Sequence, residues 1–395
     1  MGKKKIDVLL LARPDHSYTI YKGLLKSGLE FVYCSFKLMP QWIRRWVKNP
    51  RVRYYSDHYS NCKLLTLFHI YRVKYRKDNL EKYEKGLYEW HLKRLLNHVE
   101  PKIIHYWPYL SLDQIREYKK KHPEVKTFAD VYFPCEPWVL ENIRPVLKQN
   151  GLKDVLMIAE QDSKKLEKVM EFEENFLVPS QFVADTYKMY YPDKNYIIMP
   201  YGLTKWPEYK KKRHAKSHDD IRRFVYAAGG LTIQKGCDYM LRYFKNHPGL
   251  ELHIYGNIAE SQRHIFEEYT HCENIHFHGH VAKSQLQHEV SQYDAGIHLS
   301  RYDAYSLAVG EMMGAGLPVI VSDKTGIFFH VEKIGAGVVT PLDDKVIEEK
   351  VSELRNPENY NRFLDNLDAY LAGEQKYYEE EIVEFYKNEL SIINK

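Results

Sequence analysis

Short apolar segments alternate with longer amphipathic stretches along the chain, and this alternation predicts the fold class. In the front half the apolar segments lie at 6–12, 29–36, 102–107, 125–133, 175–180 and 195–200. Amphipathic stretches with helical periodicity, such as 112–122 and 180–191, separate them. Strands that alternate with helices are typical of a parallel sheet covered by helices on both faces. The front half is therefore predicted to be a doubly wound α/β domain.

The alternation stops at residues 206–220, which are polar and charged and have no apolar periodicity, so we predict a linker there. It restarts with apolar segments at 222–229, 250–256, 274–279, 293–300 and 317–323, and helical stretches such as 237–247 and 283–293 lie between them. The chain ends in two charged amphipathic stretches, about 356–372 and 376–392. We predict two doubly wound domains, 1–205 and 206–375, that face a central cleft. The C-terminal helix, 376–395, is expected to pack back on the first domain.

Composition excludes several classes of protein. The chain has 395 residues, of which 44% are hydrophobic and 28% charged, which suits folded domains and excludes a disordered or collagen-like protein. Its five cysteines are scattered and have no C-x-x-C spacing, which predicts a reduced chain without structural zinc. No apolar segment approaches the ~20 residues that span a bilayer, and the start of the chain lacks the pattern of a secretory leader. We expect a cytoplasmic protein.

Charge is divided unevenly between the two halves. Residues 1–205 carry 36 Lys and Arg against 24 Asp and Glu, whereas residues 206–395 carry 22 against 29. A basic front half and an acidic back half suggest domains with different partners. The 33 tyrosines fit carbohydrate stacking, contact with a membrane interface, or simple filling of the core.

A glycine-rich turn follows the first strand of the back half. It runs Gly229-Gly230-Leu231-Thr232-Ile233-Gln234-Lys235-Gly236 and leads into a predicted helix. Glycines let the backbone approach an anion, a helix start offers free N–H groups, and Lys235 supplies a positive charge. The spacing matches neither the Walker pattern nor G-x-G-x-x-G. The turn alone therefore fits either a phosphate site or a helix cap with a solvated lysine.

A second candidate segment follows the strand at 293–300. Asp303 lies in the loop after that strand, Ser306 is placed to cap the next helix, and Glu311 lies inside that helix. A carboxylate among small and apolar residues is costly unless it is hydrogen-bonded, and a ribose diol would satisfy it. The alternative is that Glu311 simply faces solvent.

Together these segments resemble the family 4 retaining glycosyltransferases, which have two Rossmann-like domains (the GT-B fold). The resemblance rests on the G-x(5)-K-G element at 229–236 and on the acidic pair of the E-x(7)-E motif, here Asp303 and Glu311. Further matches are Gly-Leu-Pro-Val-Ile at 316–320, Ser322, Val-Pro-Ser at 178–180, Pro-Tyr-Gly at 200–202 and Ile-His-Tyr-Trp at 104–107. They are dense over 175–340 and sparse before residue 100.

The resemblance implies a role for each matching residue. Lys235 would neutralise the diphosphate of a nucleotide-sugar donor, Glu311 would hold the ribose, and Asp303 would hold the transferred sugar. The other implied donor contacts are Gly229 and Gly230 in the turn, Val281 near the base, and Tyr305, Ser306 and Leu307 at the phosphates. No DxD triplet and no helical HxxxH pair occurs, so we expect a metal-independent reaction without a cofactor.

Three departures from the family pattern affect these expectations. Gly230 stands where most members have Arg, so that a diphosphate contact is missing or comes from elsewhere, for example Arg301. Asp303 replaces the usual Glu and alters the sugar pocket by one methylene. The front-half histidine expected after the 125–131 strand is absent, and Asp130 or His105 could serve in its place. Each could equally be a polar residue that bonds to nearby backbone.

The front half is expected to bind the acceptor, and His16, His105 and Asp130 are its candidate cleft residues. Segment 38–55 interleaves tryptophan and tyrosine with five basic residues. This mixture fits an anionic membrane surface or a solvated helix held by two core tryptophans, and less well a nucleic acid, which we do not expect as a partner.

The sequence thus predicts a retaining glycosyltransferase that moves a sugar from a nucleotide-diphosphate sugar, UDP-sugar foremost, to a glycan or a lipid-linked glycan. It would work in the cytoplasm, at the inner face of the membrane if segment 38–55 binds there. Two alternatives stay open: a nucleotide-sugar epimerase of the same fold, and a catalytically silent protein that binds glycans or nucleotides.

Overall fold

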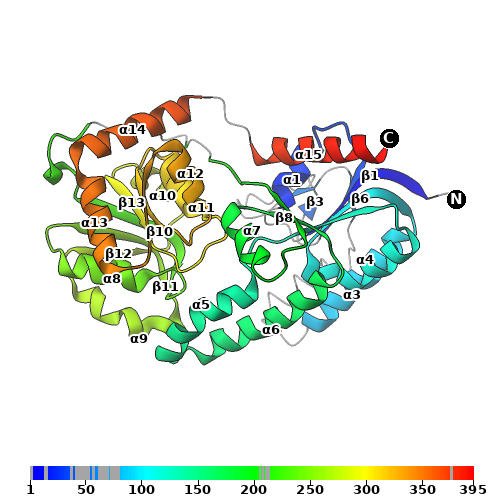
Figure 1. Ribbon diagram of the computed structural model, residues 1–395, viewed down its shortest axis with the longest axis horizontal. Coiled ribbons are helices and arrows are strands. Elements are labelled where there is room, and N and C mark those ends of the chain that lie inside the picture. The colour runs from blue at the N-terminus through cyan, green and yellow to red at the C-terminus, as the bar shows by residue number, and fades with distance from the viewer. Residues whose placement is uncertain are drawn as a thin grey trace.

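The computed structural model describes residues 3–12, 17–35, 39–40, 54–55, 58–60, 71, 81–203, 206, 209, 214–373 and 377–395. These residues form two α/β lobes that lie side by side (Figure 1). Among the helices within these ranges, none combines the length and the apolar character needed to cross a membrane.

The first lobe is built on a seven-stranded sheet with the order β5-β2-β1-β6-β7-β8-β9, and all its pairings are parallel. Its strands are β1 (Lys4–Leu11), β2 (Phe31–Cys34), β5 (Tyr59–Ser60), β6 (Val99–Tyr106), β7 (Lys126–Asp130), β8 (Asn175–Val178) and β9 (Asn195–Ile198). Its helices are α1 (Ser17–Leu24), α3 (Glu81–Leu96), α4 (Pro108–Lys121), α5 (Glu136–Gln149), α6 (Lys153–Met170) and α7 (Gln181–Lys188). A separate pair joins β3 (Met39–Pro40) to β4 (Tyr54–Tyr55).

The second lobe is built on a six-stranded parallel sheet with the order β12-β11-β10-β13-β14-β15. Its strands are β10 (Arg223–Leu231), β11 (Glu251–Ile258), β12 (Ile275–Gly279), β13 (Ala295–His298), β14 (Val319–Ser322) and β15 (Gly337–Thr340). Its helices are α8 (Cys237–Asn246), α9 (Arg263–Phe266), α10 (Lys283–Val290), α11 (Leu307–Gly314), α12 (Phe328–Ile334), α13 (Asp344–Arg355) and α14 (Pro357–Ala372). The predicted fold class, two doubly wound Rossmann-like domains, is confirmed.

The last helix, α15 (Tyr378–Ile393), leaves the second lobe and lies against α1 of the first (Figure 1). The two helices meet closely, because a Cβ atom at Gly23 would lie 2.7 Å from the carbonyl oxygen of Glu379. The apolar face of α15 presents Ile382, Tyr386 and Leu390 to the first lobe, where they are buried.

Tyrosines fill much of the interior. The largest fully buried side chains include Tyr21, Tyr33, Tyr88, Tyr106, Tyr187, Tyr226, Tyr305 and Tyr386. Of the three explanations given for the tyrosine excess, filling of the core therefore accounts for a large share.

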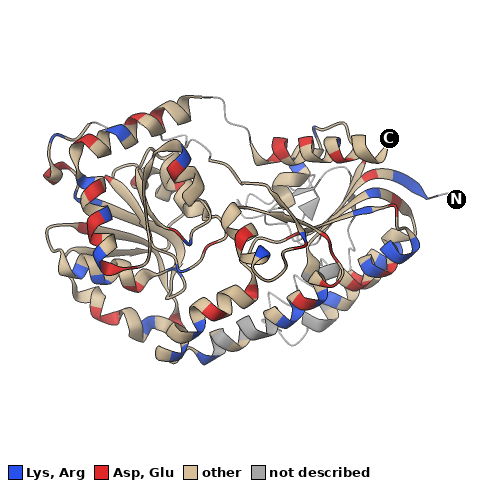
Figure 2. Cartoon of the chain, viewed as in Figure 1, with Lys and Arg blue, Asp and Glu red and all other residues tan. Residues whose placement is uncertain are grey.

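Charged side chains cover the outer helices of both lobes (Figure 2). Lysines gather in the last turn of α4, which carries Lys119, Lys120 and Lys121. On the same helix, the ring of Tyr118 lies 5.7 Å from the ammonium of Lys3. Segment 38–55, the predicted membrane-binding segment, lies almost wholly outside the described residues, as does His16.

Candidate active site

The two segments that the sequence singles out flank the point where the strand order of the second sheet reverses. The glycine-rich segment 229–236 begins in the last three residues of β10 and continues beyond the strand. The loop with Asp303 follows β13, the strand on the other side of β10 from β11. In open parallel sheets, ligands bind in the crevice outside the carboxyl ends of the strands at this switch point. The topology therefore brings both candidate segments to the expected position.

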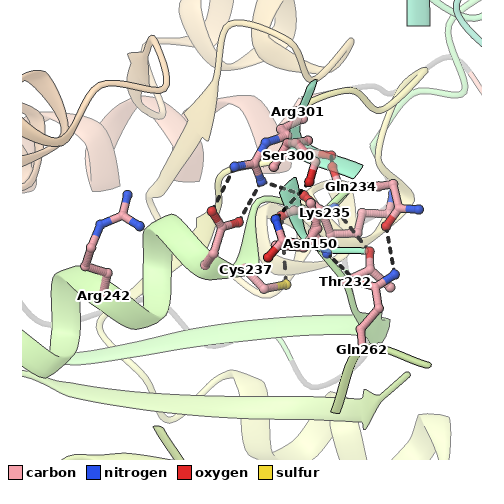
Figure 3. Close-up of polar contacts among 12 residues, drawn as sticks. Asn150, Thr232, Gln234, Lys235, Cys237, Arg242, Gln262, Ser300 and Arg301 are labelled. Atoms are coloured by element: carbon pink, nitrogen blue, oxygen red, sulfur yellow. Dashed lines mark hydrogen bonds and ion pairs between the residues drawn. The ribbon is translucent and has the colours of Figure 1, made fainter. Parts of the chain in front are cut away.

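The glycine turn is docked directly on the loop that follows β13. The backbone carbonyl oxygen of Gln234 accepts two hydrogen bonds, from the backbone amide of Arg301 at 2.9 Å and from the hydroxyl of Ser300 at 3.2 Å (Figure 3). Gly236, which begins α8, has a φ of 60°, and a Cβ atom there would lie 1.6 Å from the carbonyl oxygen of Leu299. Only glycine fits such a conformation and such a contact.

Lys235 projects from this turn to Asp303, and their Nζ and Oδ2 atoms lie 2.5 Å apart. The lysine side chain is 35% exposed and the aspartate only 15%. Although burial opposes ionisation, a hydrogen bond from His298 and the charge of Lys235 hold the pKa of the Asp303 carboxyl well below its usual range. Asp303 is therefore an anion with a cation beside it.

His298, the last residue of β13, is the functional residue that the sequence reasoning missed. Its Nε2 atom lies 3.4 Å from both the Asp303 carboxylate and the Ser306 hydroxyl. The ring is buried and stacks on Tyr226 with an interplanar angle of 6°, and burial lowers its pKa. Its place at the end of a strand, before a loop with an acidic residue, was the signal that could have identified it.

Ser306 begins α11, as the sequence predicts, but its hydroxyl makes no capping hydrogen bond. Its φ of 70° is unusual for a residue with a side chain, and such strain is concentrated at functional sites. Because the first N–H groups of a helix have no partner within the helix, the start of α11 has donors to offer. Tyr305 beside it is buried, whereas Leu307 is exposed.

Glu311 does not join Lys235 in a direct contact. Its carboxylate lies 2.7 Å from the ammonium of Lys283 at the start of α10, with the two side chains 32% and 70% exposed. Glu311 is thus partly exposed. The sequence offered a buried carboxylate that contacts a ligand or a residue that faces solvent, and the observed exposure is intermediate. Val281, predicted near the base, is half-buried on the segment that leads to α10.

Arg301, suggested as a substitute for the diphosphate contact at Gly230, is paired with an acidic residue of α8. Its guanidinium forms a two-pronged pair with Asp238 at 2.6 and 2.8 Å and donates to the Ile233 carbonyl (Figure 3). It also lies over the ring of Tyr239. The sequence could not show this partner, because Asp238 lies on another element. At Gly229 the backbone is open, since a Cβ atom there would meet nothing within 4 Å, whereas a Cβ atom at Gly230 would lie 3.5 Å from the carbonyl oxygen of Asn257.

Comparisons with known proteins place the second lobe in a family. Residues 208–367 match the family model described as glycosyl transferases group 1. The second lobe is a glycosyl transferases group 1 domain. This match confirms the resemblance drawn from its motifs.

Two curated proteins of Escherichia coli are similar to part of the chain. They are the O-antigen biosynthesis glycosyltransferase WbnH and the probable O-antigen biosynthesis glycosyltransferase WbiN, each 30% identical over 120 residues. The alignment covers 30% of this chain, and the chain spans about a third of each relative's length, 34%.

Solved structures resemble the whole chain. Sucrose-phosphate synthase from Thermosynechococcus elongatus has a TM-score of 0.67 at 15% identity, covering 98% of each chain. HepE of Anabaena, in complex with UDP and glucose, has a TM-score of 0.61 at 11% identity, covering 98% of this chain and 99% of that one. At such identities the likeness concerns the fold, and the chain has the GT-B fold.

The first lobe presents His105 and Asp130 at the carboxyl ends of neighbouring strands, β6 and β7. His105 is fully buried, and its Nδ1 atom lies 2.5 Å from the hydroxyl of Tyr386 on α15. Its Nε2 atom lies 3.5 Å from the Asp130 carboxylate. The predicted pair is thus brought together, with α15 holding the imidazole from behind.

The group 1 domain touches the first lobe beside Asp303. Ser180, which caps α7 of the first lobe, donates a hydrogen bond of 2.7 Å to the carbonyl oxygen of Ala304. Tyr305 reaches across to the carbonyl oxygen of Gly202, and Tyr201 packs between the rings of Tyr305 and Tyr378. The loop with the catalytic candidates is therefore also a contact between the lobes.

Proposed function

We propose that the chain is a retaining glycosyltransferase that moves a sugar from a nucleotide-diphosphate sugar to a glycan or lipid-linked glycan acceptor. The observation that carries the proposal is the Lys235–Asp303 pair, at 2.5 Å, on the two loops that flank the switch point of a group 1 domain. A UDP-sugar is the favoured donor, because HepE, a protein of the same fold, has been solved with UDP and glucose. The similarity to WbnH, named for O-antigen biosynthesis, favours a glycan acceptor.

In this proposal the donor diphosphate lies between the Lys235 ammonium and the start of α11. Lys235 would exchange Asp303 for the diphosphate, which leaves the Asp303 carboxylate free to accept hydrogen bonds from the sugar. Glu311, now paired with exposed Lys283, would accept the hydroxyls of the ribose. In both exchanges the carboxylate would accept hydrogen bonds from hydroxyl groups in place of an ammonium, and Asp303 would keep its contact with His298.

The proposed reaction requires stabilisation of the charge that develops as the donor bond breaks. When the bond between the sugar and the diphosphate breaks, negative charge grows on the leaving group, and the sugar takes on oxocarbenium character. A fixed ammonium and helix-start N–H groups stabilise that charge as it develops. These groups can do what a divalent cation does in other enzymes, which supports a metal-independent reaction.

The acceptor would lie against the first lobe, near His105 and Asp130. For a lipid-linked acceptor, segment 38–55 would hold the protein at the inner face of the membrane. Flotation with anionic liposomes tests this part: the full chain should float at low salt and be released at high salt. A chain that stays at the bottom of the gradient at low salt removes the membrane from the proposal.

A donor screen tests the function itself. The thermal midpoint should rise with one of UDP-, GDP-, ADP- and CMP-sugars, UDP-sugars first, because a ligand that binds only the folded state stabilises it. With that donor, Lys235→Ala and Glu311→Ala should each lower turnover about 10²–10³-fold. Lys245→Ala, which removes an exposed lysine paired with Glu268 on the same domain, should leave turnover unchanged.

Three outcomes contradict the proposal. An epimerised donor without any acceptor product would identify an epimerase. Binding of a nucleotide sugar without hydrolysis or transfer would identify a silent binding protein. Equal turnover in the wild type, Lys235→Ala and Glu311→Ala would remove these residues from the site.

A further inference from the structure

Two neighbouring strands of the second sheet present histidines on one face. Glu251 and His253 lie two residues apart on β11, and His276 and His278 lie two residues apart on β12. Residues two apart in a strand point to the same face. His253 and His276 are paired in the strand register, so all four side chains project from one small patch.

The ligand atoms of three of these residues converge. One oxygen or nitrogen atom each from Glu251, His253 and His276 lies within 4.8 Å of the others. The Glu251 Oε2 and His253 Nε2 atoms are 3.3 Å apart. Ligands in a tetrahedral zinc site lie about 3.3 Å from one another, given zinc–ligand distances of about 2.0–2.1 Å. This pair therefore already has the spacing of two zinc ligands.

His278 holds the central imidazole in the orientation that a metal requires. Its Nε2 atom lies 3.0 Å from Nδ1 of His253, and the two rings are stacked at 11°. In the tautomer whose Nδ1–H group donates a hydrogen bond to His278, the Nε2 atom of His253 has a lone pair on the side of Glu251. Metal-binding histidines are characteristically fixed in this way by a partner on the other ring nitrogen.

We propose that Glu251, His253 and His276 bind a divalent transition-metal ion, zinc foremost, which ties the edge strand β12 to β11. The geometry leaves the fourth position to water. The site lies in the amino-terminal halves of both strands, whereas the proposed donor site lies beyond the carboxyl ends of β10 and β13. The ion would thus stabilise the group 1 domain rather than take part in transfer, and the proposal stands independently of the proposed function.

One neighbouring cation competes with the ion. The Nε atom of Arg223 on β10 lies 3.7 Å from the Glu251 carboxylate, and its guanidinium lies over the ring of Tyr293. Zinc binding would draw the carboxylate away from Arg223. An Arg223→Gln variant should therefore bind zinc more tightly than the wild type, which a merely structural role of Glu251 does not predict.

The test uses the full chain, stripped of metal with a chelator and dialysed. Calorimetric titration should show one high-affinity Zn²⁺ per chain, and Zn²⁺ should raise the thermal midpoint, whereas Mg²⁺ should not. Co²⁺ should give the strong visible absorption of a tetrahedral site. His276→Asn and Glu251→Gln, at two partly exposed positions, should weaken Zn²⁺ binding at least about tenfold.

His271→Asn is the matched control, because it removes an exposed histidine of the same domain outside the patch, and it should bind Zn²⁺ as the wild type does. Equal Zn²⁺ affinity in the wild type, His276→Asn and Glu251→Gln would overturn the proposal. So would a thermal shift that Mg²⁺ produces equally well.

Discussion

Asp303 shows how one buried carboxylate can be kept ionised by residues far apart in the chain. Lys235 comes from the turn after β10, and His298 ends β13, while the Tyr305 amide lies 3.4 Å from the carboxylate. None of these contacts is strong enough alone to offset removal of the charge from water, but together they lower the pKa of Asp303. In the proposed function, hydroxyl groups of the sugar would replace Lys235 among these partners.

Lys235→Ala should destabilise the chain by about 1–2 kcal/mol, because it leaves the Asp303 carboxylate without its cation. The lysine is one-third exposed, so solvent screening keeps the loss below that of a fully buried pair. Asp303→Asn combined with Lys235→Ala should cost less than the sum of the two single changes. Urea unfolding of the four proteins measures this coupling, and strictly additive free energies of unfolding would show that the two residues act independently.

At the scale of elements, the contact between α7 and the loop before α11 joins the two lobes at the candidate site. Ser180 performs two tasks with one hydroxyl: it caps α7 by accepting from the Val183 amide and donates to the Ala304 carbonyl of the other lobe. Gly326 leaves room for this contact, because a Cβ atom there would lie 2.4 Å from the Ser180 hydroxyl. The position of the Asp303 loop therefore depends on the first lobe.

Ser180→Ala should cost about 1–2 kcal/mol of stability through the lost cap, and it should also lower turnover with the donor identified by the screen. Asn356→Ala removes a comparable cap from α14. The side chain of Asn356 accepts hydrogen bonds from the amides of Glu358 and Asn359, and all three residues lie inside the second lobe. That control should lose similar stability and keep its turnover. Equal effects of the two variants on turnover, measured at a temperature where both are folded, would show that the Ser180–Ala304 contact does not matter for activity.

The sequence predicted most of the elements, because their apolar segments are long enough to show a clear period. It did not predict β15 or α13. Strand β15 has only two large apolar residues, Val338 and Val339, between Gly337 and Thr340, so its apolar pattern does not stand out. The proposed metal-ligand patch was not predicted for a different reason: histidine pairs were sought at helical spacing, whereas here they recur at the two-residue spacing of strands.

The candidate site was predicted in its residue types but not in its pairings. The motifs identified Lys235, Asp303 and Glu311, yet no local pattern shows that Lys235 meets Asp303 or that Glu311 meets Lys283. These pairs form because the order of the strands brings distant segments together. Strand order depends on long-range packing, which no local pattern in the sequence reveals. Tyr386 is the clearest case, since it lies 281 residues beyond His105 and contacts its ring nitrogen.

At the scale of the whole molecule, each lobe has a sheet with the same kind of reversal of strand order, and the lobes touch at the Asp303 loop. Helix α15 returns from the second lobe to pack on α1 of the first. The second lobe keeps several ionisable groups out of water. His253 and His298 both lie in the second lobe, and burial lowers the pKa of each. Their titration should make the stability of the metal-free chain depend on pH.

The sign of this dependence follows from where each state binds protons. Between about pH 6.5 and 4 the unfolded chain protonates His253, whereas the folded chain does not, so stability rises with pH. The lowered pKa of His298 acts in the same direction. Each histidine contributes a slope of up to about 1.4 kcal/mol per pH unit. Asp303 acts in a lower window, because its contribution is lost only when the pH falls below the ordinary range of a carboxyl.

In the presence of chelator, the free energy of unfolding should therefore fall steadily from pH 7 to pH 5, and His253→Gln should flatten that fall relative to the wild type and to His271→Gln. Saturating Zn²⁺ should steepen it, because protons compete with the ion for the imidazoles. Denaturant unfolding at pH 5, 6 and 7, with chelator or with Zn²⁺, measures both effects. If His253→Gln leaves the slope of unfolding free energy against pH unchanged, the argument from the burial of His253 is contradicted. If Zn²⁺ leaves that slope unchanged, the proposed metal site is contradicted. One set of unfolding curves therefore tests the two separately.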